Sequence, residues 1–301
     1  MKVVKYIMSK WFSGILLILF ILFPNQVKEG VKSGLDNGFL ILIPSLFPYM
    51  VISQCFILTG GGRILSSFLY RPVNFFTGLT KKGTEIYLLS LFCGYPTGAR
   101  LASICCDNGE IGKKEKQKLF GMANIPGFGF SVAYLGSAVF KSTWFGIKIY
   151  ISFILASVFM GYFLDFFLKG TERKSNETAE INFQNALVKS TLDSSQAIIS
   201  VIAFVCFFGS LLKTISFFVE NALIFAVISG FTEITIGIPE IIKQLPNSEL
   251  AVVFFTAFSG LSIIFQSMSF QKKDGINIFL FIFLRLLFGL AASIIFYLLH
   301  L

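Results

Sequence analysis

The sequence carries little charge for its length. Aspartate, glutamate, lysine and arginine make up only 14% of its 301 residues, whereas soluble domains contain roughly 25%. Hydrophobic residues make up 55%, phenylalanine alone fills 38 positions, and the mean hydropathy is +0.78. So little charge excludes a surface that faces water. The composition predicts an all-α polytopic membrane protein.

The sequence also has little histidine, and its cysteines form no recognisable motif. The single histidine, His300, lies at the end of the sequence, and the five cysteines lie in apolar stretches without metal-ligand spacing. No paired aspartates and no serine–histidine arrangement fall at membrane depth. We therefore expect neither an enzyme nor a bound metal or cofactor. The net charge is +9. In a membrane protein an excess of lysine and arginine usually sets the orientation in the bilayer, so we expect no nucleic-acid partner.

Long apolar segments recur along the chain, each long enough to span a hydrocarbon core of about 30 Å. They fall near residues 6–23, 35–59, 143–168, 195–219 and 275–300. The one sizeable polar stretch divides the chain almost in half. The expected organisation is an N-terminal helix with a short outer loop (1–34), a first repeat (35–168), a polar cytoplasmic linker (169–194), and a second repeat with the last helix (195–301).

Four shorter apolar segments are interrupted near their middles. The interruptions lie at Gly94–Gly98, Asn124–Gly127, Gly230 and Ser259–Gly260. A shift of 136 residues carries the first onto the third and Asn124 onto Gly260. Interrupted helices at matching places in two halves indicate a transporter's binding site. We expect two repeats, each a re-entrant hairpin (84–107 and 221–243) followed by a broken helix (118–140 and 249–270).

The positive charges predict an orientation. If the N-terminus is cytoplasmic and each hairpin enters and leaves on one side, the cytoplasmic segments hold 17 lysines and arginines and the outer segments 5. This count places the open end of the first hairpin on the cytoplasmic side and that of the second on the outer side. The two repeats are therefore expected to be inverted.

The interruptions supply the candidate substrate site. Glycine permits a tight reversal, and the half-helix after each tip presents free amides and the positive end of its dipole. Thr232 is placed to cap the second of these half-helices. The predicted substrate-binding residues are Gly94, Tyr95, Thr97, Gly98, Arg100, Asn124, Gly127, Thr232, Glu233, Ser262 and Gln266.

Two ionisable residues follow the hairpin tips, near mid-membrane, where such groups are costly and usually functional. Arg100, beside half-helix N-termini, favours a solute that carries a carboxylate. Glu233 is expected to bind a coupling ion, sodium or a proton, or to hold Arg100 until the solute displaces it. A purely structural ion pair between the two residues is the alternative.

A family resemblance follows from these motifs. Cys93–Arg100 (CGYPTGAR), Asn124–Gly127 (NIPG), Glu233–Gly237 and Ser259–Ser262 with Gln266 resemble bacterial membrane proteins with a nucleoside-recognition Gate domain, above all the sporulation integral membrane proteins of Firmicutes. The resemblance extends from about Ile43 to Phe270, and Ile125 stands where that pattern has a second asparagine.

The resemblance carries expectations about function. The family is similar in plan to concentrative nucleoside transporters, whose paired hairpins and unwound helices hold substrate and a coupling cation. One sporulation member is associated with moving dipicolinic acid, a small dianion, across the outer forespore membrane. The expected function is transport of a small polar or anionic solute, dipicolinate-like or nucleoside-like, in the bacterial cell membrane or the forespore membrane. A sensor or scaffold that binds without transporting is the alternative, and homo-oligomerisation stays open.

Overall fold

The computed structural model describes residues 2–168, 180–271 and 276–300. Within those ranges the regular structure is helical, and no strand occurs. In the described residues, five helical stretches are long and apolar enough to cross a membrane: Pro24–Leu58, Thr143–Phe167, Phe183–Ser216, Glu249–Ser269 and Ile278–His300. The prediction of an all-α membrane protein is confirmed.

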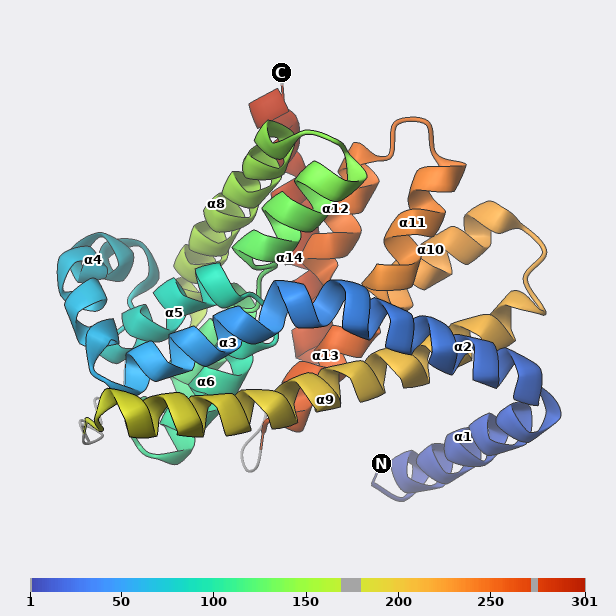
Figure 1. Ribbon diagram of the computed structural model, residues 1–301, viewed down its shortest axis with the longest axis horizontal. Helices are drawn as coiled ribbons and strands as arrows, with labels where there is room; N and C mark the ends of the chain where they lie inside the picture. The colour runs from blue at the N-terminus through green and yellow to red at the C-terminus, as the bar shows by residue number, and fades with distance from the viewer. Residues whose placement is uncertain (1, 169–179, 272–275, 301) are drawn as a thin grey trace.

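Two long helical stretches run side by side through the molecule (Figure 1). After α1 (Lys2–Leu22), the first consists of α2 (Pro24–Asn37), the π-helix η1 (Gly38–Leu42) and α3 (Ile43–Leu58). The second is α9 (Phe183–Ser216). Gly30 packs against Ser210 and Gly34 against Cys206, so the two stretches are antiparallel. Small residues at such contacts let the helix backbones approach closely, as is common inside membranes.

Two predicted boundaries are wrong. Residues 24–34 are not a loop, because Pro24 starts α2, where its missing N–H costs no helical hydrogen bond. The linker does not extend to residue 194, because Asn182 accepts a hydrogen bond from the Asn185 N–H (2.9 Å) and α9 begins at Phe183. The part of the predicted linker at 169–179 lies outside the described residues, as do Lys272 and Lys273 of the charge count.

Shorter helices fill the space beside this pair. Before α9 come α4 (Gly61–Thr77), α5 (Lys81–Cys93), α6 (Thr97–Asp107), α7 (Lys113–Met122), the π-helix η2 (Gly129–Val139) and α8 (Thr143–Phe167). After α9 come α10 (Ala222–Thr232), α11 (Ile234–Gln244), α12 (Glu249–Phe258), α13 (Gly260–Ser269) and α14 (Ile278–His300).

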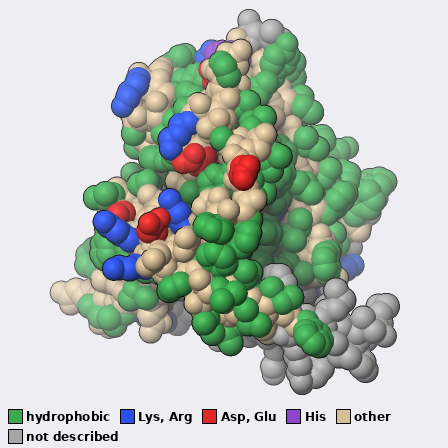
Figure 2. Space-filling view, turned by 90° about the vertical axis from the view of Figure 1, so that its right-hand side faces the viewer, with side chains coloured by type: hydrophobic (Ala, Val, Ile, Leu, Met, Phe, Trp, Pro, Cys, Tyr) green, Lys and Arg blue, Asp and Glu red, His purple; other side chains and the backbone are tan. Residues whose placement is uncertain are grey.

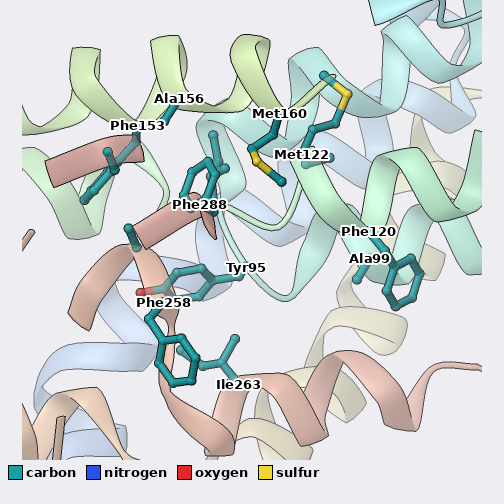
Figure 3. Packing of buried hydrophobic residues seen from close by; sticks show 14 of the residues in the cluster. Tyr95, Ala99, Phe120, Met122, Phe153, Ala156, Met160, Phe258, Ile263 and Phe288 are labelled. Atoms are coloured by element: carbon teal, nitrogen blue, oxygen red, sulfur yellow. The ribbon is translucent and has the colours of Figure 1, made fainter. Parts of the chain in front are cut away.

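One buried apolar cluster joins helices from both halves of the chain (Figure 3). The rings of Phe120 in α7 and Phe281 in α14 meet with centroids 5.6 Å apart. Tyr95, between α5 and α6, lies in the same cluster as Phe258 at the end of α12. Because lipid tails are as apolar as these side chains, close packing rather than escape from water holds such helices together.

The outer surface suits a bilayer. In Figure 2, hydrophobic side chains are spread over the face and are densest on its right, and most of the charged side chains lie on its left. Phe68, Phe75 and Trp144 are among the large hydrophobic residues with more than 65% of their surface exposed. A soluble protein rarely exposes apolar surface on this scale.

Candidate functional site

The first hairpin tip packs directly against the first broken helix. Gly94 ends α5 with φ +71°, a conformation that glycine adopts readily. The next residue, Tyr95, donates its backbone N–H to the Ile125 carbonyl (2.7 Å), between α7 and η2. A side chain at Gly127 would lie 2.8 Å from the Gly94 nitrogen, so these backbones touch. Residues 123–127 of this break are buried, and the hairpin tip covers their backbone, as irregular backbone inside a membrane requires.

The second half contains a similar junction. Ser259, with φ +77°, separates α12 from α13. A side chain on Gly260 would lie 3.1 Å from the Thr232 carbonyl, at the end of α10. The two broken helices also meet, since Ser267 of α13 donates its hydroxyl to the Asn124 amide oxygen (3.3 Å). The breaks at Gly94–Gly98, Asn124–Gly127 and Ser259–Gly260 and the junction of α10 with α11 at Glu233 thus form four interruptions in one contiguous region.

The cap of α11 differs from the prediction. Helix α10 continues through Gly230 to Thr232, and the Thr232 hydroxyl donates to the Ile228 carbonyl (2.7 Å). The capping residue is Glu233, whose extended backbone (φ −144°, ψ 111°) lets its carboxylate accept from the Thr235 N–H (2.9 Å). Thr232 is therefore not the cap, because its hydroxyl is directed back along its own helix.

A small pocket opens where this region meets the long helix pair. It has a volume of about 20 Å³, room for roughly one water molecule. Four polar residues line it, together with apolar residues of η1, α3, η2, α9, α11 and α13. The polar ones are Tyr95, Glu233, Thr235 and Gln266, and the apolar ones are Leu42, Leu46, Phe130, Val201, Val205, Ile234 and Ile263.

The Glu233 carboxylate is held by two hydrogen bonds from Thr235. Its Oε1 accepts from both the N–H and the hydroxyl of Thr235, each at 2.9 Å. The Thr235 hydroxyl accepts in turn from the Asn37 amide of α2 (3.1 Å). Asn37 was missed in the sequence, because it lies at the end of a polar stretch and contacts a residue 198 positions away. The π-helix that follows it is a feature often found at functional sites.

Several buried polar atoms in this region have no hydrogen-bond partner among the described residues. They belong to four of the residues predicted to bind substrate: Thr97 Oγ1, Asn124 Nδ2, Glu233 Oε2 and Gln266 Oε1. Buried polar groups are nearly always paired, so such a group in a native structure calls for a ligand, an ion or a water molecule. Unpaired atoms occur elsewhere in the described residues as well, but these four lie at or beside the interruptions, which makes this region the candidate site.

Arg100 is not part of the pocket. It lies one turn into α6, and its guanidinium donates to the Asp193 carbonyl of α9 (3.1 Å). The Asp193 carboxylate also accepts from the Gln54 amide of α3 (2.6 Å). The charge that faces Arg100 is Asp193 and not Glu233. The expectation that Glu233 holds Arg100 is therefore wrong, because the Arg100 guanidinium is bonded to α9 instead.

Arg285 of α14 supplies the second buried charge near the site. It is fully buried and donates to the Ala257 carbonyl and, at 3.4 Å, to the Phe258 carbonyl. Its guanidinium lies 4.5 Å from the centre of the Phe288 ring. Tyr95 donates to the Thr256 carbonyl (3.4 Å) in the same turn. The carbonyls that α12 leaves unpaired at its C-terminus are thus satisfied by side chains from α14 and the first hairpin tip.

Comparison with known proteins gives one relative. The chain is 22% identical to the sporulation integral membrane protein YlbJ of Bacillus subtilis (strain 168), over 90% of this chain and 77% of that protein. No family model matches the chain, and no solved structure matches it. The similarity and the helices support a multi-pass integral membrane protein related to a sporulation protein. The Gate-domain resemblance stays a prediction.

Proposed function

We propose that this protein transports a small polar solute across a bacterial membrane, through a site where the four helix interruptions meet. The observation that carries the proposal is their mutual contact within a helical membrane protein. Interrupted helices leave backbone groups and polar side chains free at membrane depth, and transporters use these groups to bind solutes. The unpartnered atoms of Thr97, Asn124, Glu233 and Gln266 are the contacts that such a solute would complete.

The order of elements supports a two-repeat plan. A hairpin (α5–α6), a broken helix (α7–η2) and an uninterrupted helix (α8) precede α9, and the same series follows it as α10–α11, α12–α13 and α14. In Figure 1 the connection from α11 to α12 lies at the top, whereas the connection after α6 lies at the bottom. Opposite placement is what inverted repeats require. Rocking of such repeats about a shared site gives alternating access.

The small pocket describes a closed state in this proposal. A volume of about 20 Å³ admits roughly one water molecule, so a solute enters only when the hairpin tips move away from α3 and α9. Neutral polar solutes suit the pocket, because its charged residue is an acid. A bound anionic solute would instead be stabilised by the positive ends of the half-helices or by Arg285. The similarity to a sporulation protein supports a role in spore formation.

Flux through reconstituted protein tests the proposal. Saturable uptake of labelled uridine or dipicolinate into proteoliposomes is expected, and Asn124→Leu should reduce it about tenfold, the equivalent of about 1.4 kcal/mol of lost binding. Asn25→Leu, at an exposed position of α2, is the matched control and should transport normally. Binding of either solute without flux would contradict transport and support a sensor. Absence of both binding and flux would reject these two solute classes.

A further inference from the structure

Glu233 is a buried acid whose two carboxylate oxygens have different surroundings. Oε1 accepts two hydrogen bonds from Thr235, which Asn37 holds in place. Oε2 is buried and has no hydrogen-bond partner among the described residues, and Glu233 as a whole is 1% exposed. The unpaired oxygen is therefore fixed in position by the bonds that the other oxygen makes.

A second unpaired acceptor lines the same pocket. Gln266 donates its amide nitrogen to the Ser262 hydroxyl (3.1 Å), which orients its Oε1 away from that bond. Oε1 of Gln266 is also buried without a partner. The pocket thus contains two acceptors, Glu233 Oε2 and Gln266 Oε1, and has room for roughly one water molecule. What this arrangement lacks is a charged hydrogen-bond donor, since the donor that α13 brings near Glu233 is the neutral hydroxyl of Ser262.

The charges around Glu233 do not supply that donor. Tyr95, from the first hairpin, is the titratable group that interacts with it, and Arg285 of α14 interacts with Tyr95 and donates to α12. The long helices contribute apolar residues to the pocket, and Asp36, next to Asn37, is exposed. Ser262 and Gln266 of α13 do not titrate. In the described part of the chain, no lysine or arginine forms an ion pair with Glu233.

We infer that Glu233 binds a proton at Oε2 and donates it to Gln266 Oε1, directly or through one water molecule, so that solute transport is coupled to protons. A single O–H group satisfies both unpaired acceptors and removes an uncompensated charge from an apolar region. A hard metal cation fits poorly, because such ions take about six oxygen ligands and Oε1 is already occupied. The coupling rests on the proposed transport function, whereas the proton site itself can be tested without any solute.

Infrared spectroscopy of the purified protein in lipid vesicles tests the proton site. A carboxylic-acid C=O band is expected at neutral pH, absent in Glu233→Gln and retained in the control Glu220→Gln, whose side chain is exposed. Gln266→Leu should move the loss of this band to a pH lower by about one unit or more, because the acid loses its acceptor. Glu233→Asp serves as a second variant if Glu233→Gln fails to fold, and it should shift the band rather than remove it.

Two results would overturn the inference. One is the absence at neutral pH of any band that depends on Glu233. The other is loss of the band on adding sodium chloride but not choline chloride, which would identify a sodium site. A carboxylic-acid band that depends on Glu233, in a protein that shows no solute flux, would support the proton site and contradict transport. Solute flux through a protein that lacks this band would support transport and contradict the proton site.

Discussion

At the residue scale, Arg285 holds the end of α12 at the second broken helix. Its guanidinium bonds the Ala257 and Phe258 carbonyls and stacks near Phe288. Arg285→Lys keeps the charge but loses the planar fork, so one carbonyl is left unpaired. We expect a loss of about 1–3 kcal/mol in the free energy of unfolding, measured as a lower melting temperature in detergent. The control is Arg71→Lys, at an exposed position of α4, and equal melting of the two variants would contradict this role.

Arg100 gives a second prediction at this scale, based on its contact with Asp193. We expect Arg100→Gln and Asp193→Asn to lower stability each, and the double variant to lower it less than the sum of the two. Because Arg100 is buried and Asp193 is partly buried, the coupling energy should be about 0.5–3 kcal/mol, as for residues in direct contact. Thermal melting of the four proteins measures it. Coupling of Arg100 to Glu233 in place of Asp193 would show that the geometry described here is wrong.

Glu115, at the start of α7, gives a pH dependence. Burial raises the pKa of this carboxyl above its ordinary value, although the hydrogen bond from the Thr80 N–H (2.6 Å) opposes the shift. An acid whose pKa is higher in the folded protein stabilises the fold fully below its unfolded pKa, and this contribution is lost as pH rises through the folded pKa. We expect the melting temperature of the wild type to fall relative to Glu115→Gln as pH rises above 4.5. A constant difference across that range would contradict the prediction.

At the scale of elements, the glycines of α2 set its contact with α9. A side chain at Gly34 would lie 2.6 Å from the Cys206 Cα, a backbone atom that cannot move aside cheaply. Gly34→Leu should therefore destabilise the protein by about 2 kcal/mol or more, since overpacking forces the helices apart. Gly14→Leu is the matched control, because Gly14 of α1 has open space around it. Similar melting of the two variants would show that the close contact does not stabilise the fold.

The elements also show what the sequence could and could not predict. The breaks at Gly94, Asn124–Gly127 and Ser259–Gly260 were predicted, because glycine and proline change the chain locally. Helix α2 was taken for a loop because it is polar for a membrane segment, and its partner α9 is distant in the sequence. Glycine at Gly230 suggested a break, yet α10 continues through it, because packing against α11 and Phe255 favours the helix.

At the scale of the whole molecule, the interruptions could be located from the sequence, but the directions of their side chains could not. Arg100 and Glu233 both follow a hairpin tip, and only packing decides that one faces α9 and the other faces the pocket. Asn37 and Arg285 contact the same region, but neither lies next to a helix break that could be recognised in the sequence. Long-range contacts of this sort leave no local pattern in the chain.

The inverted arrangement of the two halves gives the last prediction. Asn108 lies in the connection after α6 and Asn247 in the connection before α12, and both are exposed. In a background whose five cysteines are replaced, Asn108→Cys should react with an impermeant maleimide from the cytoplasmic side and Asn247→Cys from the outer side. Lys141→Cys, before α8, should label with Asn247→Cys, because the charge count places both outside. Restored Cys93, which is buried, is the unreactive control. Labelling of Asn108→Cys and Asn247→Cys from one side would exclude inverted repeats, and alternating access about the shared site would then lose its structural basis.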